Sequence, residues 1–216
     1  MDDDEYKTHM SIWALNASPL IMGNDIRKMT PDALSILSNP AILAVNQDPR
    51  VGAGQRHWRF YVNDTDEYGQ GEIALWTRNL NNSDVAVAFV NAGNSSREMN
   101  TTLAEIYHDQ GGERSDEARM EYDVYDLWAN RMDQATASAV LNGTAPPINS
   151  MNETSRWNVT EMSYSEGLLA NATALFGKKI GTVEPLGRLT AEVPRHGIGF
   201  FRLRATGRRL RRRDEL

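Results

Sequence analysis

The residues of this sequence whose types and position could do chemistry are Asn24 and Asp25, which follow the apolar run Leu20–Met22. Such a run suits a strand buried on both faces, and barrels and open α/β sheets place reactive side chains at the carboxyl ends of their strands. The pair could therefore lie at a pocket for a polar ligand. Both residues equally suit the turn and helix entry that begin at Gly23, and the two interpretations stay open.

The other titratable residues show no catalytic or metal-binding spacing. Cysteine is absent and no two histidines lie four residues apart, so we expect no disulfide, no zinc site and no cofactor. No Asp or Glu has a partner that the sequence assigns to acid–base catalysis. His9 could be a ligand at a pocket mouth or a helix-surface residue, and His196 is expected in a turn before the last strand. The histidines are His9, His57, His108 and His196.

Tryptophans could form a platform on which a sugar ring stacks, or they could pack in a core. Three of the four considered stand in strand-like contexts, which favours core packing. They are Trp58, Trp76, Trp128 and Trp157.

Helical segments flank the Asn24–Asp25 pair. The pattern predicts a helix from Asp2 to Leu15 with an acidic first turn and a packing stripe of Tyr6, Met10, Trp13 and Ala14. A second helix is predicted after the Thr30-Pro31 cap, and a third from Pro40 to Val45. Strand, polar turn and helix together form one βα unit of a barrel or a doubly wound sheet.

The pattern changes to strands and turns from Gln55 onward. Short apolar-polar runs separated by polar loops predict an antiparallel β-sandwich. The segment 135–171 is rich in Ala, Asn, Ser and Thr and is predicted to be an insertion or a long loop. Strands are predicted at 57–62, 72–78, 85–90, 101–106, 122–127, 188–193 and 197–204.

Two N-terminal stretches, SIWALNASPLIMGNDIR (11–27) and ILAVNQDP (42–49), carry a specific resemblance. They resemble the α-galactosidase (melibiase) family of retaining glycoside hydrolases, from the seventh helix through the eighth βα unit of its (β/α)8 barrel. YDVYDLWANR (122–131) and VPRHGIGFFRL (193–203) resemble later motifs of the same family. The resemblance implies a mainly β fold with an α/β N-terminal remnant, in which the last barrel unit precedes an antiparallel β-sandwich.

The resemblance also implies a division of the chain. Residues 1–54 correspond to the end of the catalytic barrel, 55–205 to the sandwich with an inserted loop around 133–175, and 206–216 to a basic tail. Because residues 1–50 would pack on barrel strands that this chain does not contain, we expect them to be loosely ordered or to dock on the sandwich.

The implied activity is hydrolysis of terminal α-linked galactose. Retaining enzymes need two carboxylates about 5 Å apart, and the family takes its catalytic aspartates from earlier barrel strands. We therefore expect this chain to be inactive alone, with no catalytic residue and with Asn24 and Asp25 as a supporting polar pair at the sugar pocket. A galactose-containing oligosaccharide or glycoconjugate would bind through the rest of the barrel. Alternatives are a non-catalytic carbohydrate-binding or structural β-sandwich, or a truncated gene product.

Glycosylation motifs occur in excess. The chain has nine Asn-X-Ser/Thr sequons, against about two expected by chance from its composition. The excess predicts that the natural protein passes through the secretory pathway. Asn16 is expected to stay bare, because Pro19 follows its sequon closely. The candidates for glycosylation are Asn63, Asn81, Asn94, Asn100, Asn142, Asn152, Asn158 and Asn171.

Net charge and hydropathy limit which further classes of function the sequence allows. The net charge is −6, the mean hydropathy is −0.53, and no apolar run reaches the length of a membrane span, so we expect no membrane segment and no signal peptide in MDDDEYKTHM. Seven arginines lie within 202–213. Without interleaved aromatic residues they favour a solvated terminus over a nucleic-acid or lipid site. The last residues, Arg213-Asp214-Glu215-Leu216, resemble an endoplasmic-reticulum retention signal.

Overall fold

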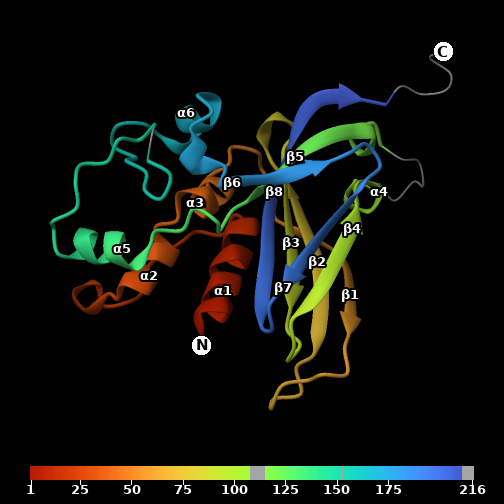
Figure 1. Cartoon of the computed structure of the whole chain (residues 1–216), viewed down its shortest axis with the longest axis horizontal. Coiled ribbons are helices and arrows are strands. Elements are labelled where there is room, and N and C mark those ends of the chain that lie inside the picture. The colour runs from red at the N-terminus through yellow and green to blue at the C-terminus, as the bar shows by residue number, and fades with distance from the viewer. Residues whose placement is uncertain (108–114, 152, 211–216) are drawn as a thin grey trace.

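The computed structural model describes residues 1–107, 115–151 and 153–210. A six-stranded antiparallel sheet has the strand order β1-β2-β3-β8-β5-β6, and a two-stranded sheet pairs β4 with β7 (Figure 1). The strands are β1 (Gln55–Tyr61), β2 (Glu72–Asn79), β3 (Val85–Asn91), β4 (Arg97–Thr102), β5 (Met120–Asp126), β6 (Lys178–Val183), β7 (Arg188–Val193) and β8 (Gly197–Arg209).

Helices occupy the N-terminal part and the segment between β5 and β6, with α4 following β4. The α-helices are α1 (Asp3–Leu15), α2 (Pro31–Leu37), α3 (Pro40–Asn46), α4 (Leu103–Ile106), α5 (Gln134–Leu141) and α6 (Tyr164–Leu169). Short 3-10 helices are η1 (Ile26–Lys28), η2 (Asn81–Ser83), η3 (Glu117–Arg119) and η4 (Thr173–Leu175).

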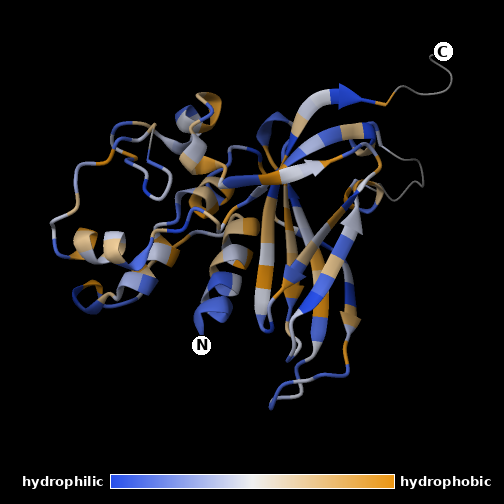
Figure 2. Ribbon diagram, viewed as in Figure 1, coloured by the Kyte–Doolittle hydropathy of each residue, from blue (hydrophilic) through white to orange (hydrophobic). Residues whose placement is uncertain are grey.

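Strand β3 lies in the middle of the sheet and separates two cores. Val85, Val87 and Phe89 point into the core shared with β4 and β7, whereas Ala86 and Ala88 point into the core shared with α1 and α3. Successive strand residues face opposite sides. The small alanine side chains therefore leave room for the helices to approach the sheet closely. Figure 2 shows apolar residues along the central strands, while the first turn of α1 is hydrophilic.

The three N-terminal helices begin where the sequence predicts. Asp2 caps α1 and forms a capping box with Glu5. Thr30 caps α2, and Asn39 caps α3, each followed by a proline at the first helical position. Prolines there have no amide hydrogen to leave unpaired.

These helices dock on the sheet rather than remain loosely ordered. Ala14, Leu15, Ile42 and Val45 expose none of their surface. They pack with Ala86, Ala88 and Phe200 in one cluster. The sheet therefore buries helix surface that was expected to face barrel strands.

The predicted packing stripe of α1 is half wrong. Met10 and Ala14 are buried, but Tyr6 and Trp13 expose 51% and 46% of their surface. The buried face instead combines Met10 and Ala14 with Ser11 and Leu15. The sheet binds one side of the helix, and the aromatic side remains open.

The predicted strand at Leu20–Met22 is wrong. This segment has no regular secondary structure, and Ile21 exposes 90% of its surface. A strand needs a hydrogen-bonded neighbour, and no described strand pairs with it.

The structure corrects three further predictions. The strand predicted at 101–106 ends at Thr102, where a capping box with Glu105 starts α4. The segment predicted as a long loop contains α5 and α6, and the edge strand β6 was not predicted. Strand β8 continues to Arg209, so the first residues of the predicted basic tail belong to the sheet.

Candidate functional site

An open groove of about 990 Å³ lies between α1, α2 and the segment 19–24. Its walls are mainly apolar and include Tyr6, Trp13, Leu20, Met22, Ile36 and Leu37, with Asn24 and His9 also lining it. The exposed aromatic side of α1 and the unpaired Leu20–Met22 segment thus face one common space.

Asn24 and Asp25 do not converge on one site. Both are exposed, and of the two only Asn24 lines the groove. The Asp25 carboxylate caps η1 by accepting bonds from the Arg27 backbone amide at 3.1 Å and the Arg27 Nε at 2.9 Å. The Arg27 side-chain hydrogen bonds lower the pKa of Asp25 below its ordinary value. This geometry matches the turn and helix-entry interpretation.

Asp3, which lines the groove, has its carboxylate paired with an arginine of the same chain. Arg131 donates to Asp3 at 2.6 Å and lowers its pKa. Burial raises the pKa of Asp84 and Asp126, but both lie outside the groove. A catalytic acid needs a raised pKa near the scissile bond. We therefore assign no catalytic acid to the described part of the chain.

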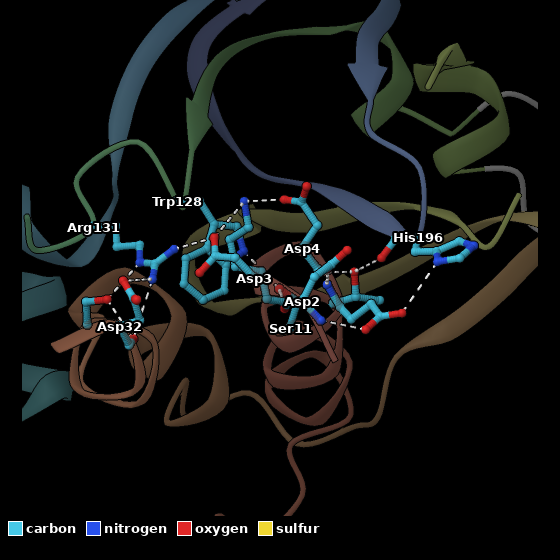
Figure 3. Close-up of polar contacts among 12 residues, drawn as sticks. Asp2, Asp3, Asp4, Ser11, Asp32, Trp128, Arg131 and His196 are labelled. Atoms are coloured by element: carbon cyan, nitrogen blue, oxygen red, sulfur yellow. Dashed lines mark hydrogen bonds and ion pairs between the residues drawn. The ribbon is translucent and has the colours of Figure 1, made fainter. Parts of the chain in front are cut away.

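The motif YDVYDLWANR fastens the N-terminal helices, as Figure 3 shows. The Trp128 indole Nε1 donates to Ser11 Oγ on α1 at 3.0 Å. Arg131 donates from Nη1 to Asp3 in the first turn of α1 and from Nε to Ser35 Oγ on α2 at 2.8 Å. One loop after β5 thereby fixes both helices.

A second set of contacts surrounds Arg78 of β2, which is 3% exposed. Its Nη1 donates to the carbonyl oxygen of Val45 at 2.5 Å and reaches that of Ala14 at 3.4 Å. Its Nη2 donates to the carbonyl oxygen of Arg50 at 3.0 Å. The last carbonyls of a helix lack intrahelical partners and carry partial negative charge. Arg78 therefore caps the C-terminal ends of α1 and α3 together.

Three buried charges and the half-buried Arg204, which lies 3.2 Å from Asp84, complete what we call the junction cluster. Its members are Asp48, Arg78, Asp84, Arg202 and Arg204. Arg202 Nε lies 2.7 Å from Asp84 Oδ2, and its Nη2 lies 3.5 Å from Asp48 Oδ2. Asp48 also accepts from the Asn81 backbone amide at 2.9 Å. Burial raises the pKa of Asp84, while Arg202 opposes the rise. Arg202 is thus a structural residue of the sheet, and the prediction of a solvated terminus is wrong for it.

Comparison with known proteins identifies the family. A family model for the α-galactosidase C-terminal β-sandwich domain matches residues 70–149, and a model described as α-galactosidase A matches residues 1–48. The chain is 48% identical over 206 residues to α-galactosidase 2 of Saccharomyces cerevisiae, covering 94% of this chain. The chain belongs to the α-galactosidase family.

The family's solved structures agree with the fold. A Saccharomyces cerevisiae α-galactosidase superposes with a TM-score of 0.87 at 46% identity, over 95% of this chain and 44% of that one. An α-galactosidase from Mortierella vinacea, 23% identical with a TM-score of 0.60, shares the fold and covers 94% of this chain and 36% of its own. The chain spans less than half the length of these relatives, 42% for the first.

Of the five tryptophans, the four that could have formed a sugar platform do not share one. Trp58 packs against the core between the two sheets, Trp76 and Trp128 against the core under α1 and α3, and Trp157 against the cluster near α6. Three separate clusters hold them, which confirms core packing.

Each described histidine has its own environment in the structure. His9 is exposed and contacts Trp13 edge-on with ring centroids 6.0 Å apart. His57 Nε2 lies 2.6 Å from Thr77 Oγ1, and burial lowers its pKa. His196 lies in the predicted turn before β8, with φ of 48°. His108 is outside the described residues. Among the described residues, no group of three or more His, Asp or Glu could hold a metal ion.

The sequons differ in the state of their amide nitrogens, the atoms that would carry a glycan. Asn16 Nδ2 donates to the Ile12 carbonyl oxygen at 2.9 Å, and Asn158 Nδ2 donates to Glu161 Oε1 at 2.8 Å. Asn81 is half-buried, and Asn152 lies outside the described residues. The exposed candidates are Asn63, Asn94, Asn100, Asn142 and Asn171.

Two further predictions concern the C-terminal retention-like tetrapeptide and membrane-spanning segments. Arg213-Asp214-Glu215-Leu216 lies outside the described residues. Within them, no helix is both long and apolar enough to cross a bilayer.

Proposed function

We propose that this chain works as part of an α-galactosidase-like retaining hydrolase that removes terminal α-linked galactose. The observation that carries the proposal is the 48% identity to an α-galactosidase along 206 residues, from α1 through the sandwich. A solved α-galactosidase from Saccharomyces cerevisiae with raffinose, 46% identical to this chain, supports a galactose-containing oligosaccharide as substrate.

In this proposal residues 1–54 complete a catalytic barrel. The segment from residue 55 to the end of β8 forms the sandwich, with an insertion around 133–175 that contains α5 and α6. The predicted basic tail of 206–216 thus begins inside β8. The open groove between α1 and α2 is then covered by the remaining barrel strands. Exposed Tyr6, Trp13 and Ile21 support that role, because such apolar surface on a soluble chain marks an interaction site. Asn24 and Asp25 would stand at the rim of the sugar pocket as supporting polar groups.

The chemistry would be double displacement through a covalent galactosyl-enzyme. It needs a nucleophilic carboxylate and an acid/base carboxylate about 5 Å apart, which the rest of the barrel would supply. The 216-residue chain alone should therefore not hydrolyse an aryl α-galactoside. Hydrolysis by the purified chain that survives removal of host glycosidases would contradict this.

Secretory routing belongs to the same proposal. The excess of sequons supports it, as does the exposure of Asn63, Asn94 and Asn142. Mass spectrometry of the protein from its native host should find glycans on these asparagines and a bare Asn16. Unmodified asparagine at every exposed sequon would contradict the routing. If the final tetrapeptide acts as a retention address, replacing Leu216 should increase export.

A further inference from the structure

A small cavity of about 40 Å³ opens beside the junction cluster, between the β2–β3 turn and α6. Arg202, 2% exposed, lines it. Arg202 Nη1 has no hydrogen-bond partner among the described residues. Phe176 forms another wall, with the Arg204 guanidinium carbon 3.8 Å from its ring centroid. Solvent that enters this cavity therefore reaches the buried Arg202–Asp84 pair directly.

Asn81 forms part of the cavity wall and starts the sequon Asn81-Asn82-Ser83. Its backbone is fixed, because its amide donates to Asp48 Oδ1 at 2.9 Å. Asn82 and Ser83 have φ of 58° and 62°, which makes a tight turn with both residues exposed. The Asn81 side-chain amide makes no hydrogen bond within the described part of the chain, in contrast to Asn16 and Asn158.

A second sequon, at Asn171, is linked to the cavity only through Arg204, which lines it. Asn171 is exposed and accepts a hydrogen bond on Oδ1 from Arg204 Nη2 at 2.9 Å. Its Nδ2 is left without a hydrogen bond inside the described residues. Next to it, Leu169 lines the cavity and exposes 69% of its surface. Of the two acceptors, Asn81 alone lines the cavity, beside the exposed Leu169 and the buried charges.

We propose that Asn81 carries an N-linked glycan whose first sugar covers this cavity and shields the junction cluster. The inference rests on the secretory routing proposed above. In the attachment step a lipid-linked diphosphate oligosaccharide is the co-reactant. A bond forms between Asn81 Nδ2 and the sugar C1, the bond from C1 to the diphosphate oxygen breaks, and the proton lost by Nδ2 passes to the lipid diphosphate or to solvent. The lipid diphosphate leaves, so no oxidant or reductant is needed.

The physical benefit follows from the surroundings of Asn81. The apolar face of the first sugar covers the exposed Leu169 side chain and removes it from water. Excluding water from the cavity lowers the local dielectric constant and strengthens the attraction between Arg202 and Asp84. The cavity itself is too small for a sugar ring, so the sugar lies over the opening.

The test uses the 216-residue chain with a secretion leader in a eukaryotic host. Two variants remove the sequon, Asn81→Gln and Ser83→Ala, and Asn142→Gln removes a sequon at the end of α5 as the matched control. The same variants made without glycans in the bacterial cytosol report any effect of the substitutions themselves. Trimming the glycans enzymatically to the first sugar tests whether that sugar suffices.

Peptide mass spectrometry should find Asn81 glycosylated. In the secreted protein each Asn81 sequon variant should lower Tm by about 2–4 °C and speed exchange of the Asn81 backbone amide, while Asn142→Gln does neither. The differences should vanish in bacterial protein, and trimmed protein should keep its Tm. A bare Asn81 beside occupied Asn63 or Asn142 overturns this proposal alone, as does an occupied Asn81 with unchanged Tm. Bare asparagine at every sequon overturns the routing as well.

Discussion

Arg202 and Asp84 form a buried ion pair in which Nε of the arginine lies 2.7 Å from Oδ2 of the aspartate. The arginine side chain is 2% exposed and the aspartate 4%. The pair joins β8 to the turn before β3, and Asp48 extends it toward the end of α3. The contact between the N-terminal helices and the sheet therefore depends on charges that are almost fully buried, beside the cavity of about 40 Å³ that Arg202 and Asp84 both line.

Replacing Arg78 with Met should loosen α1 and α3 from the sheet. The substitution removes the Arg78 donor from the carbonyl oxygens of Val45 and Arg50, and leaves Val45 with only the long bond of 3.4 Å from the Asp48 amide. The variant also loses the buried cation beside Asp48. Breaking a buried charge interaction together with its hydrogen bonds should lower the free energy of unfolding, measured in urea, by about 3–5 kcal/mol. The control Arg59→Met, on the exposed edge strand β1, should change stability by less than about 1 kcal/mol. Equal losses in both variants would show that the caps contribute nothing.

Replacing Arg202 with Met should give a pH-dependent loss of stability. Asp84 already has a pKa raised by burial, and Arg202 opposes that rise. Without the arginine the folded-state pKa rises further above the unfolded value near 4. The folded state then binds more protons, so the variant's deficit of about 3–5 kcal/mol at pH 7 should shrink as pH falls toward 4.

The matched control for this prediction is Arg208→Met on the same strand. Arg208 pairs with Glu121 at 2.8 Å but is 69% exposed, so its loss should cost less than about 1 kcal/mol. Adding Asp84→Asn to Arg202→Met should flatten the pH dependence. A deficit that stays constant from pH 7 to pH 4 would rule out Asp84 as the titrating group.

The strands of the sandwich were the most predictable elements. Glu72–Asn79 and Val85–Asn91 follow from apolar residues with few breakers, and Arg188–Val193 was predicted at its observed bounds. Leu20–Met22 failed because a strand is defined by its neighbour, which a local pattern does not contain. α4 was missed although Thr102 and Glu105 have capping-box spacing, a signal present in the sequence.

Asp64 provides a separate pH prediction. Hydrogen bonds from Ser95 and Arg97 lower the pKa of its carboxyl to about 2. A lowered folded pKa contributes stability above the unfolded value, and that contribution is lost as pH falls from about 4 to about 2. Ser95→Ala removes the larger cause and keeps the sequon at Asn94, so carbon NMR should find the Asp64 pKa raised. An unchanged titration would show that Arg97 alone sets it.

The junction cluster was harder to predict than the strands. Arg78 stands between Thr77 and Asn79 at the polar end of β2, so nothing in the sequence signals that it is buried. Its partners are backbone carbonyls more than 25 residues away. Arg202 was grouped with the terminal arginines because it lies near them in sequence. Only the pairing of β8 with β3 turns it toward Asp84. Composition and spacing carry no information about such long-range partners.

The central claim is that this chain completes an α-galactosidase. The most direct measurement joins it to the remainder of α-galactosidase 2 of Saccharomyces cerevisiae, in place of the 206 residues that it matches there. The secreted, folded chimera is assayed for hydrolysis of an aryl α-galactoside, beside the 216-residue chain alone. We predict activity in the chimera and none in the chain alone. A folded chimera without activity, or a chain that is active by itself, would contradict the account.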